Sequence, residues 1–441
     1  MTVIANKCPD YKVTVVDKSV ERINAWNSNE LPIYEPGLKE RVMKVRGKNL
    51  FFSTDIDEGI KEADIIFVSV NTPTKAFGEG AGKASDLQYI ENIARRIKEC
   101  AKSGKVIVEK STMPVRAAEA LNRILHSGGN SVHFEVLSNP EFLAEGTAIR
   151  DMENPDRVLI GSNNTPTGLK ARNELMKIYQ RWVPKDKVIT TNLWSSELSK
   201  LVSNAFLAQR VSSINSVSAI CEMTEADINE VANAVGKDSR IGEKFLRAGV
   251  GFGGSCFRKD ILSMVYLCEY YGLNDVAQFW LQVINMNDYQ MERFVKRILQ
   301  AMFNTLVDKK IAIFGFAFKP NTGDTRDAPA IYICQRLLRE KAKLNITDPQ
   351  ALKNAQEDMR GIQGDVKYEP DPYKAAKNTH AIVLLTDWEC FRDLDYKRIY
   401  KNMEKPAFVF DGRNLLDHDK LYKIGFNVYP LGKPKRDHFT S

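Results

Sequence analysis

The sequence predicts an α/β protein with two parallel β-sheets, joined by a long central helix and a helical layer. Residues 12–112 and 309–413 alternate short β-branched or aromatic runs with helical patterns. Such alternation favours parallel sheets covered by helices. Between them, residues 195–235 repeat apolar side chains at three- and four-residue spacing, which is typical of helices. We therefore expect domains at residues 1–193, 194–302 and 303–441.

The strands of the first α/β stretch are short and apolar. They are KVTVVD (12–17), ADIIFVSV (63–70) and KVIVEKST (105–112), with helical patterns at 19–26 and 87–102. The second stretch has strands at KKIAIFGFAFK (309–319), KLNITDP (343–349), HAIVLLTD (380–387) and AFVFDGR (407–413), with a helix near 328–341. The last residues, GKPKRDHFTS, are polar and are expected to fray.

Composition excludes several classes of protein. The chain has 441 residues, 43% of them hydrophobic, enough for two or three cores, but no apolar run approaches the ~20 residues of a membrane span. The N-terminus lacks the pattern of a secretion signal. Seven cysteines without a CxxC pair predict a reducing compartment, the cytosol, and five scattered histidines predict no metal site. A charge of +7 spread along the chain favours small anionic ligands over nucleic acid.

The two α/β stretches differ at their start. KLNITD follows a strand, a turn at Gly315 and a helix, whereas KVTVVD follows only 11 residues. A Rossmann-like dinucleotide fold opens with a strand, a GxGxxG loop that holds pyrophosphate, and a second strand that ends in an acid for the ribose. Asp17 suits that acid, and Arg22 suits a phosphate or ribose contact; the alternative is that Asp17 only caps the next helix.

The stretch GVGFGGSCFRKD (249–260) is the most informative motif, because five of its twelve residues are glycine or serine. Small residues allow a ligand to approach the backbone closely. Cys256 is followed by Arg258 and Lys259, and positive neighbours favour the nucleophilic thiolate. The alternative is an inert buried cysteine, which we accept for Cys100, Cys268 and Cys334.

Three further stretches carry polar groups in positions that suit chemistry. In LSNPEFLAEGTA (137–148), one helical turn would place Glu141 and Glu145 on one side, where apolar neighbours suit a general base. Lys200 and Asn204 share one edge of a predicted helix and could stabilise an oxyanion. Lys319 and Arg326 follow a strand and suit an anion. Each has a structural alternative. The two glutamates could be solvated residues at a helix start, Lys200 and Asn204 could face solvent, and Lys319 and Arg326 could lie in an ordinary turn.

Together these stretches resemble the UDP-glucose 6-dehydrogenase family, especially its animal members, from Val3 to about Gly432. The matching words include INAWNS, LPIYEPGLKE, GKNLFFST, SVNTPTK, LSNPEFLAEGTA, NPDRVLIG, WSSELSKL, NAFLAQR, GFGGSCF, MNDYQ, FGFAFK and TGDTR. The resemblance implies NAD-dependent oxidation of UDP-glucose to UDP-glucuronate, which supplies glycosaminoglycan and polysaccharide synthesis. It also implies an NAD-binding, a central dimerisation and a UDP-sugar-binding domain, in that order.

By this resemblance Cys256 is the nucleophile that captures the aldehyde intermediate, which is oxidised to a thioester. Glu141 is the base for thioester hydrolysis, and the other catalytic residues are Lys200, Asn204, Asp260 and Thr112. The implied NAD-binding residues are Asp17, Arg22, Val70, Asn71, Thr72, Pro73, Thr74, Ser111, Thr112, Met113, Glu145, Lys259 and Arg326. An aspartate at the ribose position favours NAD over NADP.

The resemblance also implies a set of residues around the nucleotide sugar. They are Glu141, Phe142, Leu143, Lys200, Asn204, Arg240, Phe245, Leu246, Arg247, Gly253, Phe318, Lys319 and Arg413, of which Arg413 is open to coming from a neighbouring subunit. Assembly through the central helices into a homo-oligomer, a hexamer built of dimers, is implied, as is feedback inhibition by UDP-xylose at the sugar site.

The chain departs from the family pattern at its start, where a strand and GAGYVG are expected. We expect the absence of that central strand to expose both neighbouring strands and to weaken NAD binding severely. One hypothesis is a truncated form of a competent enzyme. The alternatives are a non-catalytic nucleotide-sugar-binding subunit that has lost NAD binding, and a dehydrogenase of another nucleotide sugar.

Overall fold

A computed structural model describes residues 1–129 and 132–439. By their contacts they form two compact units. The N-terminal unit comprises Met1–Ser203 and Leu262–Gly272, and the C-terminal unit comprises Asn204–Ile261 and Leu273–Ser441. The three domains expected at 1–193, 194–302 and 303–441 stay a prediction. Within the described ranges, no helix is both long and apolar enough to span a membrane.

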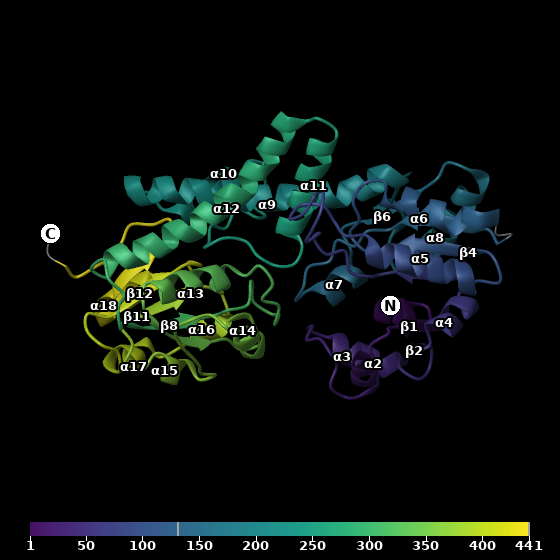
Figure 1. The fold of residues 1–441 in the computed structure, drawn as a ribbon. Coiled ribbons are helices and arrows are strands. Elements are labelled where there is room, and N and C mark those ends of the chain that lie inside the picture. Colours follow the sequence, from purple (N-terminus) through teal and green to yellow (C-terminus); the bar gives the residue numbers. More distant parts are fainter. Residues whose placement is uncertain (130–131, 440–441) are drawn as a thin grey trace. The chain divides into compact units, whose positions relative to one another are not determined.

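Helices and strands alternate along the N-terminal unit (Figure 1). Its elements are α1 (Thr2–Lys7), β1 (Val13–Val16), α2 (Val20–Asn27), α3 (Leu38–Val45), β2 (Leu50–Ser53), α4 (Ile56–Glu62), β3 (Ile65–Val68), α5 (Gln88–Cys100), β4 (Lys105–Glu109), α6 (Ala117–His126), β5 (Phe134–Ser138), α7 (Ala148–Glu153), β6 (Val158–Ser162), α8 (Pro166–Tyr179) and β7 (Val188–Asn192), with short 3₁₀ turns at Ser127–Gly129 and Lys185–Lys187.

Strands β3 to β7 form one five-stranded sheet in chain order. Its pairs are parallel except β5 with β6, which meet antiparallel at Ser138 and Gly161. Successive side chains point to opposite faces, so Val108 packs into one core while Ile107 packs into another. The sheet is therefore covered on both sides, as the sequence pattern predicts.

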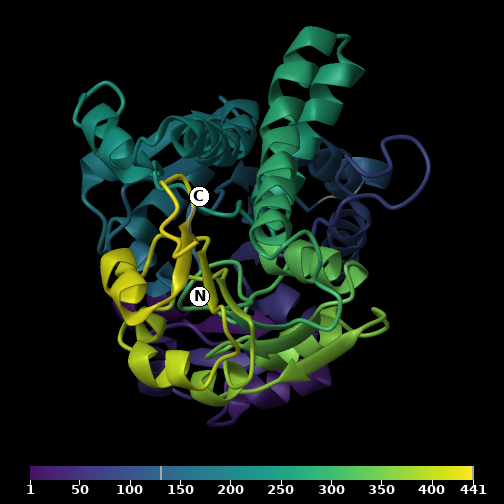
Figure 2. The same cartoon turned by 90° about the vertical axis from the view of Figure 1, so that its left-hand side faces the viewer.

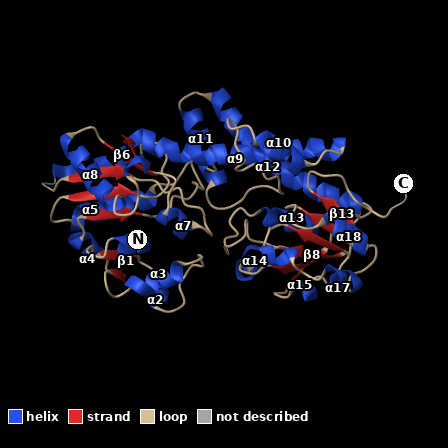
Figure 3. Ribbon diagram, turned by 180° about the vertical axis from the view of Figure 1, so that it is seen from behind, coloured by secondary structure: helices blue, strands red, loops and turns tan. Residues whose placement is uncertain are grey.

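Strands β1 and β2 form a separate parallel sheet (Figure 3). In the described part of the chain, β1 pairs only with β2, and β3 pairs only with β4 on its own sheet. Although β1 is apolar, three of its four residues are only partly buried. Both strands nevertheless contribute to one hydrophobic core with α1. This agrees with the expectation of two exposed neighbouring edges.

Four helices follow the first sheet. They are α9 (Leu193–Thr224), α10 (Ile228–Gly236), α11 (Phe257–Tyr270) and α12 (Asn274–Ala301). Helix α9 runs for 32 residues, which confirms the predicted long central helix. It begins in the N-terminal unit and ends in the C-terminal unit.

The C-terminal unit holds the second α/β arrangement. Its remaining elements are β8 (Lys310–Phe314), α13 (Pro329–Arg339), β9 (Lys343–Thr347), α14 (Leu352–Asp358), β10 (Asp365–Tyr368), α15 (Pro372–Ala375), β11 (Ala381–Leu384), α16 (Glu389–Arg392), α17 (Tyr396–Lys401), β12 (Phe408–Asp411), α18 (His418–Ile424) and β13 (Asn427–Pro430). After β13 the chain turns back, and Val428 pairs antiparallel with Arg436. The yellow part of Figure 2 contains this C-terminal segment.

The six strands of this unit lie in the order β10-β9-β8-β11-β12-β13, all parallel. This is the strand order of dinucleotide-binding folds. The central strands are continuously apolar because both faces of the sheet are covered: Ile311 and Ile313 pack into one core, and Ala312 packs into the other.

Candidate active site

Glu141 and Lys200 meet in the N-terminal unit. The Lys200 ammonium lies 3.4 Å from the Glu141 carboxylate, and the Lys200 side chain is only 4% exposed. Glu141 follows β5, and Lys200 lies in the second turn of α9. A buried cation is stabilised by its pairing with a carboxylate. The structure therefore contradicts the solvent-facing alternative for Lys200.

Two cations lie close to the Phe142 ring. The guanidinium carbon of Arg157 lies 3.9 Å from the centre of the Phe142 ring, and the Lys200 ammonium lies 5.4 Å from it. Arg157 also donates to the Ser203 hydroxyl at 3.2 Å. Cation–π contacts of this kind fix the ring and with it the backbone next to Glu141. Sequence reasoning missed Arg157, although it lies in the word NPDRVLIG.

The segment from Glu141 to Glu145 is not helical, contrary to the turn expected there. Helix α7 begins only at Ala148. Pro140 precedes the segment, and the Glu141 carboxylate accepts from the Leu143 amide at 2.7 Å, so a local side-chain bond replaces a helical one. Glu35 instead accepts from the amides of Gly146 and Ala148, both at 2.8 Å, at the start of α7.

Two loops predicted to bind cofactor lie side by side. The Ser111 hydroxyl donates to the Val70 carbonyl at 2.6 Å, and the Thr72 hydroxyl donates to the Thr112 carbonyl at 3.0 Å. Both loops follow neighbouring parallel strands, β3 and β4, whose carboxyl ends meet at one edge of the sheet. Ligands of open α/β sheets bind at this edge. The two loops therefore fit a dinucleotide.

Asp17 lies directly after β1. Its carboxylate accepts from the Ser19 amide at 2.8 Å and lies 3.6 Å from the Arg22 guanidinium. The side chain of Asp17 is 36% exposed, which leaves it accessible to ribose hydroxyls. Asp17 thus makes the local contact expected of a residue that caps the next helix. Its position also fits a contact with the cofactor ribose.

Two buried carboxyl groups lie close to each other in the N-terminal unit. Glu109 ends β4 and Glu197 lies on α9, and both residues are almost fully buried. The Glu197 carboxylate accepts from the amides of Arg116 and Ala118 at the start of α6. The carboxyl groups of Glu109 and Glu197 interact directly with each other. Burial, and next the charge of Glu197, raises the pKa of Glu109 well above its ordinary value.

Replacement of Glu109 by glutamine is expected to stabilise the protein at neutral pH. Burial raises the pKa of Glu109 well above its ordinary value and that of Glu197 to about 7, so from pH 4.5 to 7 both carboxyl groups hold protons in the folded chain that they lose in the unfolded chain. The free energy of unfolding therefore falls as pH rises through this window. Glu109→Gln should flatten that dependence and add about 1 kcal/mol at pH 8. Urea unfolding at four pH values measures the free energy of unfolding and its dependence on pH. The exposed control Glu91→Gln should keep the wild-type slope, and an equal slope in Glu109→Gln would contradict the prediction.

In the C-terminal unit, Asn204, Cys256 and Asp260 lie at the meeting of α9 and the first turn of α11. The Asn204 amide donates to the Asp260 carboxylate at 2.6 Å, and both residues are buried. Cys256 directly precedes α11, and its carbonyl accepts from the Asp260 amide at 2.9 Å. Its thiol lies 3.3 Å from the Ser255 hydroxyl. A helix N-terminus favours negative charge, which suits a thiolate nucleophile.

The loop before Cys256 packs backbone against backbone with residues 324–328. The Gly254 amide donates to the Arg326 carbonyl at 2.8 Å. A Cβ at Gly253 would lie 2.4 Å from the Asp327 carbonyl oxygen. No side chain can move to relieve that contact, so only glycine fits at this position.

Gly253→Ala is expected to lower the free energy of unfolding by about 2–4 kcal/mol and to displace the loop that carries Cys256. Thermal melting checks the loss. Gly323→Ala is the control, because its methyl group would lie 3.2 Å from its nearest neighbour, the Gln350 carbonyl. Equal melting temperatures for the two variants would refute the prediction.

A pocket of about 210 Å³ opens beside this loop. Three cations line it, Arg247, Lys319 and Arg413, together with apolar groups and Asp387. The other lining residues are Val211, Phe245, Ala248, Gly251, Phe252, Gly253, Phe257 and Phe318. Cations suit a diphosphate and aromatic rings suit a planar base. Arg413 lines the same pocket as Lys319 of its own chain, so no neighbouring subunit is needed to bring it there.

Arg413 is held from several sides. Its Nε donates to the Leu385 carbonyl at 2.7 Å, its amide donates to the Asp411 carboxylate at 3.0 Å, and its carbonyl accepts from Arg247 at 3.1 Å. Burial lowers the pKa of Arg413 from its ordinary value. An anion in the pocket would compensate this buried charge.

Other predicted substrate and cofactor residues do not line the pocket. Arg240 binds Asp238 at 2.6 Å and is 87% exposed, whereas Leu246 packs against the core. Arg326 binds Asp324 at 2.6 Å. The roles of these three residues stay predictions.

The loop after β8 is closed to a second dinucleotide. Its amides at Phe316 and Ala317 donate to the Asp348 carboxylate at 2.7 and 3.0 Å. Trp388 donates to the same oxygen. Because these amides already have a partner, they are not available to hold a pyrophosphate. Phe318 and Lys319, further along the same loop, line the pocket.

Three family models match successive parts of this chain. Models of the UDP-glucose/GDP-mannose dehydrogenase family match residues 1–183 (NAD binding domain), 194–289 (central domain) and 312–418 (UDP binding domain). UDP-glucose 6-dehydrogenase of Drosophila melanogaster is 58% identical over 442 residues, covering 98% of this chain and 93% of the relative. UDP-glucose 6-dehydrogenase 4 of Arabidopsis thaliana is 57% identical over 452 residues, covering 98% and 94%.

A solved structure, a UDP-glucose dehydrogenase from Pyrobaculum islandicum, matches with a TM-score of 0.83 at 28% identity, covering 96% of this chain and 94% of its own. The UDP-D-ManNAc dehydrogenase of Pyrococcus horikoshii matches in fold with a TM-score of 0.79 at 23% identity. The folds, the cation-lined pocket and the sequence matches lead to one conclusion. The chain belongs to the UDP-glucose/GDP-mannose dehydrogenase family.

Proposed function

We propose that the protein oxidises UDP-glucose to UDP-glucuronate with NAD. The observation that carries the proposal is Cys256 at a helix N-terminus, flanked by Gly253 and Phe257 of a pocket with three cations. UDP-glucose supplies a diphosphate for the cations and a primary alcohol for oxidation. Relatives named UDP-glucose 6-dehydrogenase, 57–58% identical, favour this sugar over GDP-mannose or a UDP-amino sugar.

The reaction removes two hydrides and adds one water. NAD, when bound, accepts a hydride in each oxidation. The Cys256 thiolate adds to the aldehyde carbon, and oxidation of that thiohemiacetal leaves a thioester. Glu141 takes a proton from water, which attacks the thioester carbon and releases the carboxylate and the thiolate. Asn204, Asp260, Lys200 and Thr112 are proposed to hold the reacting oxygens and the water.

The loops at residues 70–74 and 111–113, with Asp17, are proposed to hold NAD, because their hydrogen bonds join them at the carboxyl edge of one sheet. Glu145 and Lys259 complete the proposed set with Arg22 and Arg326. We propose that the protein acts in the cytosol, and its seven free cysteines suit that reducing compartment.

A second copy of the chain is the proposed partner. Within the C-terminal unit, α9 and α12 leave large apolar side chains exposed, namely Phe206, Ile220, Met223, Val276, Phe279 and Tyr289. Apolar surface of this extent favours association. We propose a dimer through these helices, assembly of dimers into a hexamer, and feedback inhibition by UDP-xylose at the sugar pocket.

The test is NADH formation from NAD and UDP-glucose, with two NADH expected for each UDP-glucuronate. A version extended before Met1 by an apolar strand and a GxGxxG loop should bind NAD more tightly, because β1 and β3 present unpaired edges to such a strand. If neither version forms NADH but both bind UDP, the alternative of a non-catalytic nucleotide-sugar-binding subunit is favoured.

A further inference from the structure

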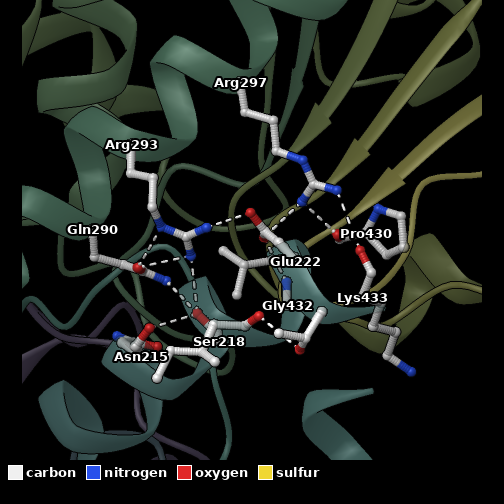
Figure 4. Close-up of polar contacts among 12 residues, drawn as sticks. Asn215, Ser218, Glu222, Gln290, Arg293, Arg297, Pro430, Gly432 and Lys433 are labelled. Atoms are coloured by element: carbon white, nitrogen blue, oxygen red, sulfur yellow. Dashed lines mark hydrogen bonds and ion pairs between the residues drawn. The ribbon is translucent and has the colours of Figure 1, made fainter. Parts of the chain in front are cut away.

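A network of buried polar side chains joins α9 and α12 in the C-terminal unit (Figure 4). We call it the Glu222 network. It comprises Asn215, Ser218, Glu222, Gln290, Arg293 and Arg297. Asn215, Ser218 and Gln290 are fully buried, and the side chains of Glu222, Arg293 and Arg297 are at most 16% exposed. Nothing in the proposed chemistry uses these residues directly.

The amide of Gln290 has only one possible orientation in this network. Its oxygen accepts from Nε and Nη2 of Arg293, at 3.2 and 3.0 Å. Because arginine has no acceptor, Arg293 must face the oxygen end of the amide. The nitrogen of Gln290 therefore faces the Gly249 carbonyl, to which it donates at 2.8 Å.

Arg293 is itself fixed by other members of the network. It donates to the Glu222 carboxylate and, at 2.9 Å, to the Ser218 hydroxyl. Glu222 also accepts from Arg297 and from the Gly432 amide, both at 2.7 Å. A continuous set of hydrogen bonds thus runs from the segment after β13 to Gly249.

Gly249 is held on both sides of its backbone. Its amide donates to the Asn215 oxygen at 2.9 Å, and its carbonyl accepts from Gln290. A Cβ at Gly249 would lie 2.6 Å from Nη1 of Arg413. Arg247, two residues earlier, and Arg413 both line the pocket. Gly249 therefore packs directly against the Arg413 side chain and lies in the same loop as Arg247.

We propose that Gln290 is a positioning residue for the nucleotide sugar: oriented by Arg293, it holds the Gly249 backbone so that Arg247 and Arg413 face the diphosphate. This inference rests on the proposed function, because it assumes that the pocket binds UDP. Loss of the amide leaves a buried carbonyl without its donor, and the loop must shift to regain one.

The experiment measures UDP binding by calorimetry in the full chain. Gln290→Met keeps the shape of the side chain but removes the donor, so the Kd for UDP should rise about 10-fold, and KM for UDP-glucose should rise similarly with kcat within about twofold. The matched control is Glu292→Gln on the same helix. It breaks the pairing of Glu292 with Arg336 and Tyr332, none of which lines the pocket, and should keep the wild-type Kd.

Gln290→Glu separates positioning from stability. Its carboxylate still pairs with Arg293 but places an oxygen against the Gly249 carbonyl. A purely structural role predicts wild-type UDP affinity for Gln290→Glu, whereas positioning predicts a loss like that of Gln290→Met. Unchanged UDP affinity in the folded Gln290→Glu variant would overturn the proposal even if Gln290→Met failed to fold. A wild-type protein that bound no UDP would instead overturn the proposed function on which it rests.

Discussion

Cys256→Ala is expected to lower the rate of UDP-glucuronate formation at least ~10³-fold, because the thioester cannot form without the thiol. The pocket residues Arg247, Lys319 and Arg413 remain, so the Kd for UDP should stay within about twofold of the wild-type value. Stopped assays for UDP-glucuronate and calorimetry with UDP measure the two quantities. The control is Cys390→Ala, which removes an exposed thiol and should keep wild-type activity.

The same assignment predicts selective protection of one thiol. UDP-glucose should slow alkylation of Cys256, because the pocket residues Gly253 and Phe257 flank it, and should leave alkylation of Cys390 unchanged. Near-wild-type turnover by Cys256→Ala would contradict the covalent step. Equal alkylation of Cys256 with and without UDP-glucose would contradict its position beside the sugar pocket.

Local patterns in the sequence predict the sheets and the helical layer well. The central strands β8 and β11 are apolar runs because both faces of the sheet are buried there, and such runs are visible residue by residue. The three- and four-residue spacing of apolar side chains in residues 195–235 indicates the helix that carries Lys200 and Asn204. The sequence does not show that β1 and β3 lie in separate sheets, which the structure does.

Contacts between distant segments are not visible in this way. Arg157 lies over the Phe142 ring because the fold brings their two loops together. No spacing in the sequence indicates this contact. Glu141 avoids the expected helical turn because its own carboxylate bonds the Leu143 amide. Gln290 reaches Gly249, 41 residues earlier, only because α12 packs beside that loop. The residue type suggests what each side chain can do, whereas the residue that it contacts is known only from the fold.

Glu141→Gln is expected to stop the reaction at the thioester. Glutamine keeps the size of the side chain but cannot take a proton from water, so kcat should fall about 10²–10³-fold. Each active site should still release two NADH in one burst, since both oxidations precede hydrolysis. Mass spectrometry should then find the sugar nucleotide bound to Cys256. Glu174→Gln, which changes an exposed ion pair with Lys177, is the control and should turn over normally.

The number of NADH in the burst identifies the step that Glu141 serves. Two NADH and a stable adduct assign Glu141 to hydrolysis, whereas one NADH would place the block before the second oxidation. Lys200, 3.4 Å from Glu141, loses its charged partner in the variant and is itself buried. Its uncompensated charge would favour a developing oxyanion rather than oppose it. Steady turnover by Glu141→Gln would therefore contradict the role of Glu141 as the base, because the remaining charges favour the reaction.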